Sequence, residues 1–273
     1  QLLLSKKLAT IILNVPVEFD AELFKLKSPK QDLIIPLFKE LEFKKTTERV
    51  LKSFNLENNS KNLNIFENEA LDTSQFILKE IIPNSEINNL VQKLQEKKNI
   101  VFYLQINNEN PLEAEIKSIF FSIGKQENYI IHCTNNYSET FDILQKFKPI
   151  FDNNEIVLVS YNIKIMIATL FWYEINPKNN IEDAQIMHYL INPDGKHNLN
   201  DLLIDYLDLN ISKDELENLF YVKYSLTLEL CQKFKNILEQ KGLKEVYSNI
   251  EEPLIKVLAY IENTGFKIDK DAL

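Results

Sequence analysis

Residue types that carry recognisable chemistry are scarce in this chain of 273 residues, which has two cysteines and three histidines. Two cysteines cannot build a disulfide framework or a four-ligand zinc site, and we interpret Cys133 and Cys231 as half-buried apolar thiols in a reducing cytoplasm. His132, His188 and His197 are scattered without the spacing of metal ligands. The sequence therefore predicts neither a disulfide nor a structural metal.

Positive charge and long apolar runs are also scarce. The formal net charge is −9, and Arg49 is the only arginine. Nucleic-acid binding draws mainly on cations that neutralise phosphates, so this composition argues against independent DNA binding. No apolar run approaches the roughly 18–20 residues that a membrane helix needs. We expect a cytoplasmic monomer without membrane contact.

Hydrophobic residues make up 45% of the chain, enough for one large α/β core with appended helices. Residues 29–53 have the apolar spacing of two short helices. The polar stretch NLENNSKNLN that follows is typical of a surface linker. The first residues, QLLLSKKLAT, lack an initiating methionine, and Leu273 falls within an expected helix. Both ends therefore look like cuts inside a longer polypeptide.

The rest of the chain has an α/β pattern. Residues 99–106 (NIVFYLQI) predict a strand buried on both faces, and 115–123 and 127–133 complete a three-strand meander. A helix near 138–149 with Ser138 as N-cap, a strand at 155–160 and a helix at 162–173 follow. Further helices are expected at 183–191, 199–207, 212–240 and 243–263.

Five segments, in three separate regions of the chain, resemble bacterial DNA polymerase I, a family A polymerase. LSKKLATI, NVPVEFD and LFKELEFKK are similar to the connector after that family's 5′-nuclease domain. NPDGKHNLNDLL matches a stretch of its 3′–5′ exonuclease domain, and IEEPLIKVLAYIENTGFKID resembles the opening helix of its polymerase domain. The resemblance implies a connector at residues 1–69, an exonuclease-like domain at 70–240 and the start of a polymerase domain at 241–273.

The fold that this resemblance implies is the ribonuclease-H-like (DnaQ-like) 3′–5′ exonuclease fold. We expect a mixed sheet of about five strands flanked by helices, with 99–106 central. In that family four carboxylates hold two divalent cations beside the scissile phosphate, and a tyrosine orients the attacking water. The first two acids stand one residue apart, which places both on one side of a strand. Here those positions are Tyr103 and Gln105, pinned by PLEAE at 111–115.

The remaining two acidic positions are also changed. The family motif Asn-x-Lys-x-Asp appears as Asn162-Ile-Lys164-Ile-Met166, with Met166 at the acid. Asn162 and Lys164 are retained and are expected to position the backbone at a strand-to-helix turn. The motif Tyr-x-x-x-Asp falls on Leu219 and Lys223, although a shift of the helix would bring in Tyr221 or Tyr224 instead.

These replacements leave no anion to offset the charge of two divalent cations. We therefore expect no metal, no cofactor and no nuclease activity, with the former metal site filled by packed side chains. Met166 should be buried, and Lys223 should reach water or pair with a carboxylate. The sequence favours a non-catalytic scaffold in a DNA polymerase I that works in DNA replication and repair. Its partners would be the polymerase and 5′-nuclease domains of the same parent chain, through which alone it would meet DNA.

Two other functions remain open. A surviving exonuclease could use relocated ligands such as Glu109, Glu113 and Glu115, although strand alternation favours a solvated face for them. A domain that binds single strands without cutting could use Trp172 as a stacking platform, although a helical aromatic cluster is more often core.

Two polar residues have a simpler structural interpretation. Asp183 is expected to cap a helix. His197 is expected to brace the loop before the 199–207 helix, because the sequence offers it no catalytic partner. Phe171 and Tyr173 are interpreted with their neighbour Trp172 as core residues.

Overall fold

The computed structural model describes residues 2–11, 16, 20–22, 25–41, 43–54, 71–83, 86–108, 110, 113–209, 211–265 and 267–269. They form two compact units, residues 1–67 and 68–273. The described helices of the first unit are α1 (Leu2–Ala9), α2 (Gln31–Glu40) and α3 (Lys44–Ser53). The last two confirm the short helices expected within 29–53. The predicted linker NLENNSKNLN lies outside the described residues.

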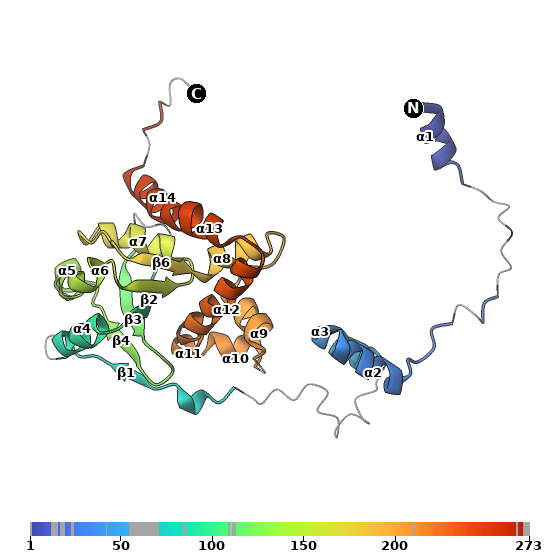
Figure 1. Cartoon of the computed structure of the whole chain (residues 1–273), viewed down its shortest axis with the longest axis horizontal. Coiled ribbons are helices and arrows are strands. Elements are labelled where there is room, and N and C mark those ends of the chain that lie inside the picture. Colours follow the sequence, from blue (N-terminus) through green and yellow to red (C-terminus); the bar gives the residue numbers. More distant parts are fainter. Residues whose placement is uncertain are drawn as a thin grey trace. The chain divides into compact units, whose positions relative to one another are not determined.

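The second unit is built on a mixed sheet of six strands (Figure 1). The strands are β1 (Leu78–Glu80), β2 (Asn99–Ile106), β3 (Ile116–Ser122), β4 (Asn128–His132), β5 (Val157–Ser160) and β6 (Asn180–Asp183). They lie in the order β1-β4-β3-β2-β5-β6, with β2–β3 and β3–β4 antiparallel and the other pairs parallel. The central place of 99–106 is confirmed.

Alternation along β2 divides the core into two clusters. Phe102 and Leu104 point to one face of the sheet, and Val101 points to the other. The first face is covered by α4 (Ile87–Gln95), α5 (Tyr137–Lys146), α6 (Lys148–Phe151) and α7 (Ile163–Phe171). The second is covered by α8 (Ala184–Ile191), α9 (Leu199–Leu207), α10 (Lys213–Glu217), α11 (Phe220–Ser225) and α12 (Thr227–Gln240).

The chain then continues through α13 (Lys244–Val246) and a π-helical turn (Tyr247–Glu251) into α14 (Glu252–Thr264), which lies across α7 and β6 (Figure 1). These C-terminal elements belong to the same compact unit as the sheet. The assignment of 1–69 to a connector and of 241–273 to a polymerase domain stays a prediction. No helix among the described residues is long and apolar enough to span a bilayer.

Two details of the helices differ from expectation. Ser138 is not an N-cap: α5 begins one residue earlier, and the side chain of Asn136 accepts the hydrogen bond from the Ser138 amide at 3.0 Å. The helix expected over 212–240 is three helices. The backbone of Leu219 (φ −103°, ψ 59°) leaves the helical region, whereas Leu226, between α11 and α12, keeps helical angles. The break at Leu219 separates α11 from α10.

Asp183 joins the starts of two helices. Its Oδ1 accepts from the amides of Gln185 (2.8 Å) and Ile186 (3.3 Å) in α8, which confirms the expected cap. Its Oδ2 accepts from the amide of Ile163 at 2.7 Å, in the first turn of α7. Asn162, the residue before α7, has φ 55° and makes no cap bond of its own. Burial raises the pKa of Asp183, while these amides work against the rise.

Replacing Asp183 with asparagine should lower the free energy of unfolding by about 2 kcal/mol, because an NH₂ group would face a backbone N–H donor. Urea denaturation measures the loss. Asp142→Asn, at an exposed position of α5, is the matched control and should change stability by less than about 0.5 kcal/mol. Equal losses in the two variants would contradict the role given to this carboxylate.

Candidate functional site

The candidate site lies where β2 and β5 separate. Their parallel pairing ends at Val101↔Val159, although β2 continues to Ile106. In such sheets, ligands bind in the crevice beside the carboxyl ends of the strands, where two neighbouring strands separate. Here the backbone groups left without a strand partner are taken by side chains. Ser160 Oγ donates to the carbonyl of Phe102 at 2.7 Å, and the amide of Leu104 donates to Met166 Sδ at 3.1 Å.

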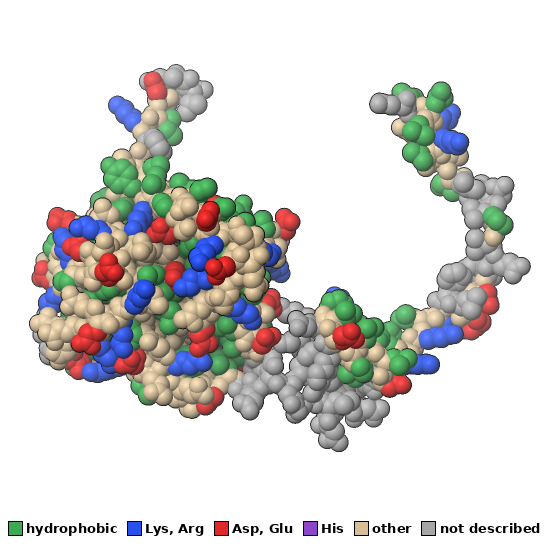
Figure 2. All heavy atoms as spheres, in the orientation of Figure 1, with side chains coloured by type: hydrophobic (Ala, Val, Ile, Leu, Met, Phe, Trp, Pro, Cys, Tyr) green, Lys and Arg blue, Asp and Glu red, His purple; other side chains and the backbone are tan. Residues whose placement is uncertain are grey.

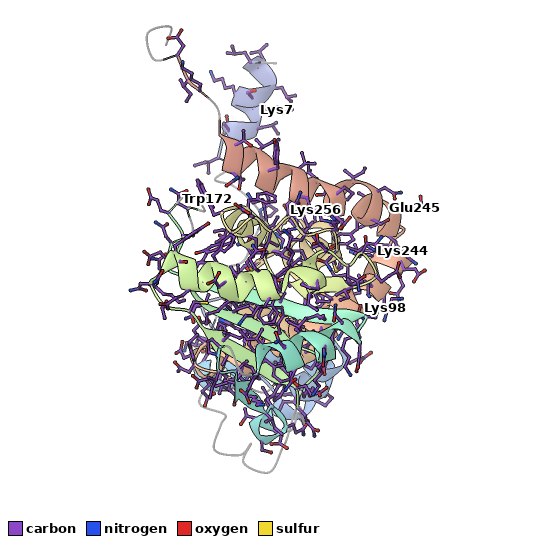
Figure 3. The ribbon with its side chains drawn as sticks, turned by 90° about the vertical axis from the view of Figure 1, so that its left-hand side faces the viewer. Lys7, Lys98, Trp172, Lys244, Glu245 and Lys256 are labelled. Carbon is purple, nitrogen blue, oxygen red and sulfur yellow. The ribbon has the colours of Figure 1, made fainter. Side chains whose placement is uncertain are left out.

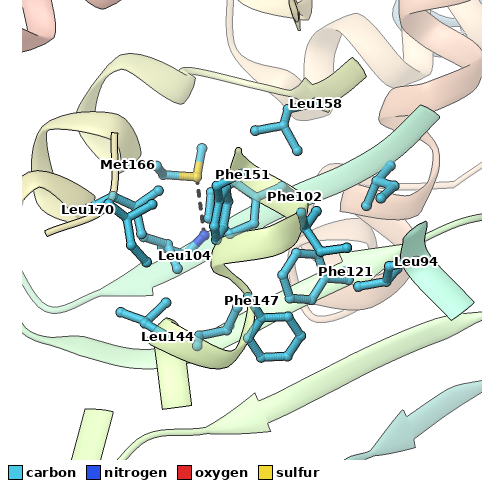
Figure 4. Packing of buried hydrophobic residues seen from close by; sticks show 14 of the residues in the cluster. Leu94, Phe102, Leu104, Phe121, Leu144, Phe147, Phe151, Leu158, Met166 and Leu170 are labelled. Atoms are coloured by element: carbon cyan, nitrogen blue, oxygen red, sulfur yellow. Dashed lines mark hydrogen bonds between the residues drawn. The ribbon is translucent and has the colours of Figure 1, made fainter. Parts of the chain in front are cut away.

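Met166 fills this crevice from α7. Its side chain is 1% exposed, as expected, and belongs to the core cluster of the first face. Figure 4 shows its sulfur directed at the backbone nitrogen of Leu104, with Leu170 and Phe151 close by. A thioether is only a weak acceptor and a soft ligand. The position can therefore satisfy one amide and fill volume, but it does not provide the hard oxygen ligand that magnesium requires.

Tyr103 is covered by α11. Its ring stacks on Tyr224 with centroids 3.7 Å apart and meets the edge of Phe220 at 5.6 Å. Burial, followed by the proximity of Tyr103, raises the pKa of Tyr224 far above its ordinary value, so this phenol stays neutral. Tyr224 is thus the tyrosine of α11 that meets β2, whereas Tyr221 is only half-buried.

Gln105 lies on the same side of β2 as Tyr103, two residues further along. It is exposed, and its Oε1 accepts from Ser118 Oγ of β3 at 2.9 Å. The neutral amide oxygen is therefore used within the sheet.

Lys223 is buried, and it pairs with a carboxylate as expected. Its ammonium is 2.8 Å from Glu217 Oε2 and 5.4 Å from the ring centroid of Tyr224. Asn200 Nδ2 donates to the same carboxylate oxygen at 2.7 Å. These two hydrogen bonds, with that of Lys223 the stronger, lower the pKa of Glu217. Leu219 is half-buried one helical turn before Lys223, and its carbonyl accepts from the Lys223 amide at 2.9 Å.

The structure brings β2, α7 and α11 together at two of the predicted positions, whereas Gln105 and Lys223 have partners outside the group, Ser118 and Glu217. Met166 reaches the β2 backbone between Tyr103 and Gln105, while Tyr224, next to Lys223, stacks on the first of them. The sequence alone does not identify Ser160 and Glu217 as residues of this site. Neither belongs to a family motif, and the lysine's partner stands across the break between α10 and α11, where helical spacing gives no signal.

The described residues contain no group of three or more His, Cys, Asp or Glu side chains that could hold a metal. Glu113 and Glu115 are exposed and bonded to Asn108 and Asn107, whereas Glu109 lies outside the described residues. A solvated face, as favoured from the sequence, describes the two that are seen.

His197 braces its loop as expected. Its Nδ1 lies 2.7 Å from Nδ1 of His188 in α8, and its carbonyl accepts from the Tyr161 hydroxyl at 2.9 Å. The two cysteines are free, and burial raises the pKa of Cys133 to about 11 and that of Cys231 well above its ordinary value. Neither thiol is suited to act as a nucleophile at neutral pH.

The aromatic cluster at the end of α7 is not all core, which corrects the expectation. Tyr173 is buried and Phe171 is half-buried, but Trp172 is 47% exposed. The helix ends at Phe171, so Trp172 follows the last turn and its indole is not drawn into the packed face.

A separate pocket of about 610 Å³ opens between β6, α12 and α13. The positions predicted for the metal site do not line it: Tyr103, Gln105, Met166, Leu219 and Lys223.

The family model described as 3′–5′ exonuclease, of family A DNA polymerases, matches residues 79–219, which is 141 of 273 residues. The chain belongs to this family. The match spans β2 with Tyr103 and Gln105, α7 with Met166, and Leu219 at its last residue. The family resemblance found in the sequence is thus confirmed.

The relatives place this family domain in a longer protein. DNA polymerase I of Caldicellulosiruptor bescii is 25% identical over 272 residues, covering 99% of this chain and 28% of that protein. The chain spans between 24% and 32% of the length of the first curated relatives, all described as DNA polymerase I.

Solved structures share the fold. The POL domain of Pol1 from M. smegmatis superposes with a TM-score of 0.57 at 13% identity, covering 70% of this chain and 33% of that one. Escherichia coli RNase D, an exoribonuclease, superposes with a TM-score of 0.53 at 11% identity, covering 67% and 51%. The exonuclease fold predicted from the sequence is confirmed. The sheet has six strands instead of about five, and the edge strands β1 and β6 are too short to be recognised in the sequence.

Replacing Glu217 with glutamine should lower the free energy of unfolding by about 1 kcal/mol, because the buried Lys223 ammonium loses its anion while the carboxylate itself is largely exposed. Glu217→Gln/Lys223→Met, which removes both charges, should recover part of the loss. Glu245→Gln, at an exposed site of α13, is the control. Urea titrations at neutral pH decide, and a double variant weaker than Glu217→Gln would argue against the pair.

The same pair predicts a pH dependence. The folded pKa of Glu217 lies below its ordinary value of 4.5, so its contribution is present above pH 4.5 and is lost as the pH falls through the folded pKa. The stability difference between the wild type and Glu217→Gln should therefore shrink as acid is added below pH 4.5. Denaturation midpoints at several pH values test this, and a difference that grows in acid would be the wrong sign.

Proposed function

We propose that this chain is a 3′–5′ exonuclease-like domain that no longer cuts DNA and serves as a structural scaffold within a DNA polymerase I. The observation that carries the proposal is the set of contacts at the degenerate positions. Tyr103 is stacked on Tyr224, Met166 is bonded to the β2 backbone, and Lys223 is neutralised by Glu217.

Electrostatics support the loss of activity. Two divalent cations bring a charge of about +4, which hard oxygen anions must offset. The replaced positions offer a phenol, an amide, a thioether and an ammonium group, so the balance is reversed. Packing supports it as well, since aromatic rings and a thioether occupy the crevice at the end of β2.

The scaffold would connect the polymerase and 5′-nuclease domains of its parent chain during DNA replication and repair in the cytoplasm. Direct DNA binding has little support. The net charge is −9, and on the visible face of the second unit acidic and basic side chains are interspersed (Figure 2). Phosphate binding needs an excess of cations. A monomer that meets DNA only through its parent fits this composition. The alternative function is an exonuclease that binds its metals through relocated ligands, and a nuclease assay distinguishes the two.

The purified chain should release no mononucleotides from single-stranded or mismatched DNA with magnesium, manganese or zinc. The family's metal ligands are replaced by groups that carry no negative charge, which removes the basis for activating water. A gel assay with end-labelled DNA measures the release. Metal-dependent cleavage that a point change within this chain abolishes would overturn the proposal in favour of relocated ligands.

Restoring two acids should not restore cutting. Tyr103→Asp/Met166→Asp should lower stability by about 3–5 kcal/mol, because it buries carboxylates without partners and removes packing. The control that keeps side-chain volume is Tyr103→Phe/Met166→Leu. It gives up the Tyr103 hydroxyl and the weak thioether acceptor of the Leu104 amide, so it should lose about 1–2 kcal/mol, less than the aspartate variant. Thermal melts and the same nuclease assay compare the two. Tight metal binding and cleavage by the aspartate variant would mean that the site had lost its metal ligands but kept an open pocket, which contradicts repacking.

A further inference from the structure

Among the described residues, no strand pairs with the outer edge of β6, yet the backbone at that edge is hydrogen-bonded. β6 pairs with β5 on one side only. Along an edge, alternate residues present their N–H and C=O groups outward, a row that normally invites another strand. Four such groups, contributed by Asn179, Ile181 and Asp183, all have partners, and every partner is a side chain from residues 247–256.

The three side chains complete the edge as a neighbouring strand would. Lys256 Nζ donates to the carbonyl of Asn179. The Ile181 amide donates to Glu252 Oε1 at 3.0 Å, and its carbonyl accepts from the Tyr247 hydroxyl at 3.1 Å. The Asp183 amide donates to the same hydroxyl at 2.8 Å. One phenol thus closes two of the four positions.

The π-helical turn explains how these side chains line up. Glu252 and Lys256 are four residues apart and share one face of α14. Tyr247 is five residues before Glu252, and a π-turn, with its i→i+5 hydrogen bonding, brings residues five apart onto one face. The three groups therefore follow one another along the strand. Figure 3 shows Lys256 beneath α14, on the side that faces the rest of the unit.

Burial gives these bonds weight. Tyr247 is 7% exposed, and burial raises its pKa well above the ordinary value, so the hydroxyl keeps the proton that it donates. Burial also raises the pKa of Glu252 and lowers that of Lys256, and the two opposite charges counter both changes. Burying these polar groups without hydrogen-bond partners would cost free energy of folding. Their burial therefore depends on the hydrogen bonds that they make to the β6 backbone.

A second contact fixes α14 to α7. Ile255 and Ala259 are buried in the core cluster that also contains Met166. On the outer side Lys164 of α7 pairs with Glu262, and Tyr260 meets Phe171 edge-on. The helix that closes the degenerate site on one side thus supports α14 on the other.

We propose that the outer edge of β6 and the outer face of α7 hold the chain's own residues 244–264 rigidly, making that segment a joint that fixes the orientation of the polymerase domain proposed for the parent chain. This inference rests on the proposed scaffold function and gives it a mechanism. A domain that has lost catalysis still orients its neighbour if the connecting helix cannot move. The filled crevice contributes, because Met166 packs the same α7 on which α14 rests.

Amide hydrogen exchange on the intact chain, read by NMR, tests the joint. In the wild type, amides of α14 should be protected to the same degree as those of α7. Tyr247→Phe keeps the ring but removes both hydroxyl bonds, so the Asp183 amide should exchange about tenfold faster, with a smaller acceleration along α14. Tyr189→Phe, the same change at an exposed tyrosine of α8 outside the joint, should leave both unchanged.

Two further variants keep the test decisive if Tyr247→Phe disturbs the fold. Glu252→Gln retains an acceptor for the Ile181 amide and should preserve its protection, whereas Glu252→Ala should expose it. Fast exchange along wild-type α14, or unchanged exchange at Asp183 in Tyr247→Phe, would overturn the joint. The nuclease assay on the same samples separates the two proposals. Cleavage with a protected α14 refutes only the scaffold's inactivity, and a silent protein with a detached α14 refutes only the joint.

Discussion

Asp183 connects four elements of the second unit, namely β6, α7, α8 and the π-turn before α14. Its carboxylate holds the first turns of α7 and α8, and its own amide is held by the hydroxyl of Tyr247. A strand end, two helix starts and the π-turn before α14 thus meet at one residue. Each helix N-terminus presents unpaired amides and a partial positive charge, so a buried carboxylate is the group that can serve both.

The degenerate site is a consequence of this frame. With α7 fixed at its start, the residue at position 166 faces the edge of β2 that β5 no longer covers. An acid there would need cations to balance it, whereas a methionine needs none and still accepts from the Leu104 amide. The other candidate position of β2 is also packed without a charge, because the rings of Tyr103 and Tyr224 stack.

Much of this arrangement could be predicted from the sequence, and each feature that could not be predicted has a physical reason. Doubly apolar β2, the Asp183 cap and the burial of Met166 followed from pattern, motif and chemistry. That Lys223 would need a carboxylate followed from desolvation, but Glu217 could not be named because its position depends on the break at Leu219. Edge strands β1 and β6 are short and polar and give no alternating signal.

The C-terminal helix was the least predictable part. Its outline is visible in the sequence, but the π-turn is a local departure of one residue per turn, which apolar periodicity does not register. That single turn decides whether the phenol of Tyr247 reaches β6 or solvent. Its effect on the edge also explains why an inactive domain would keep its shape. The backbone of β6 needs the side chains of 247–256, α14 needs the face of α7, and α7 needs a packed residue at Met166. Under the proposed function, loss of the metals would remove one role from the fold and leave each of these mechanical requirements in place.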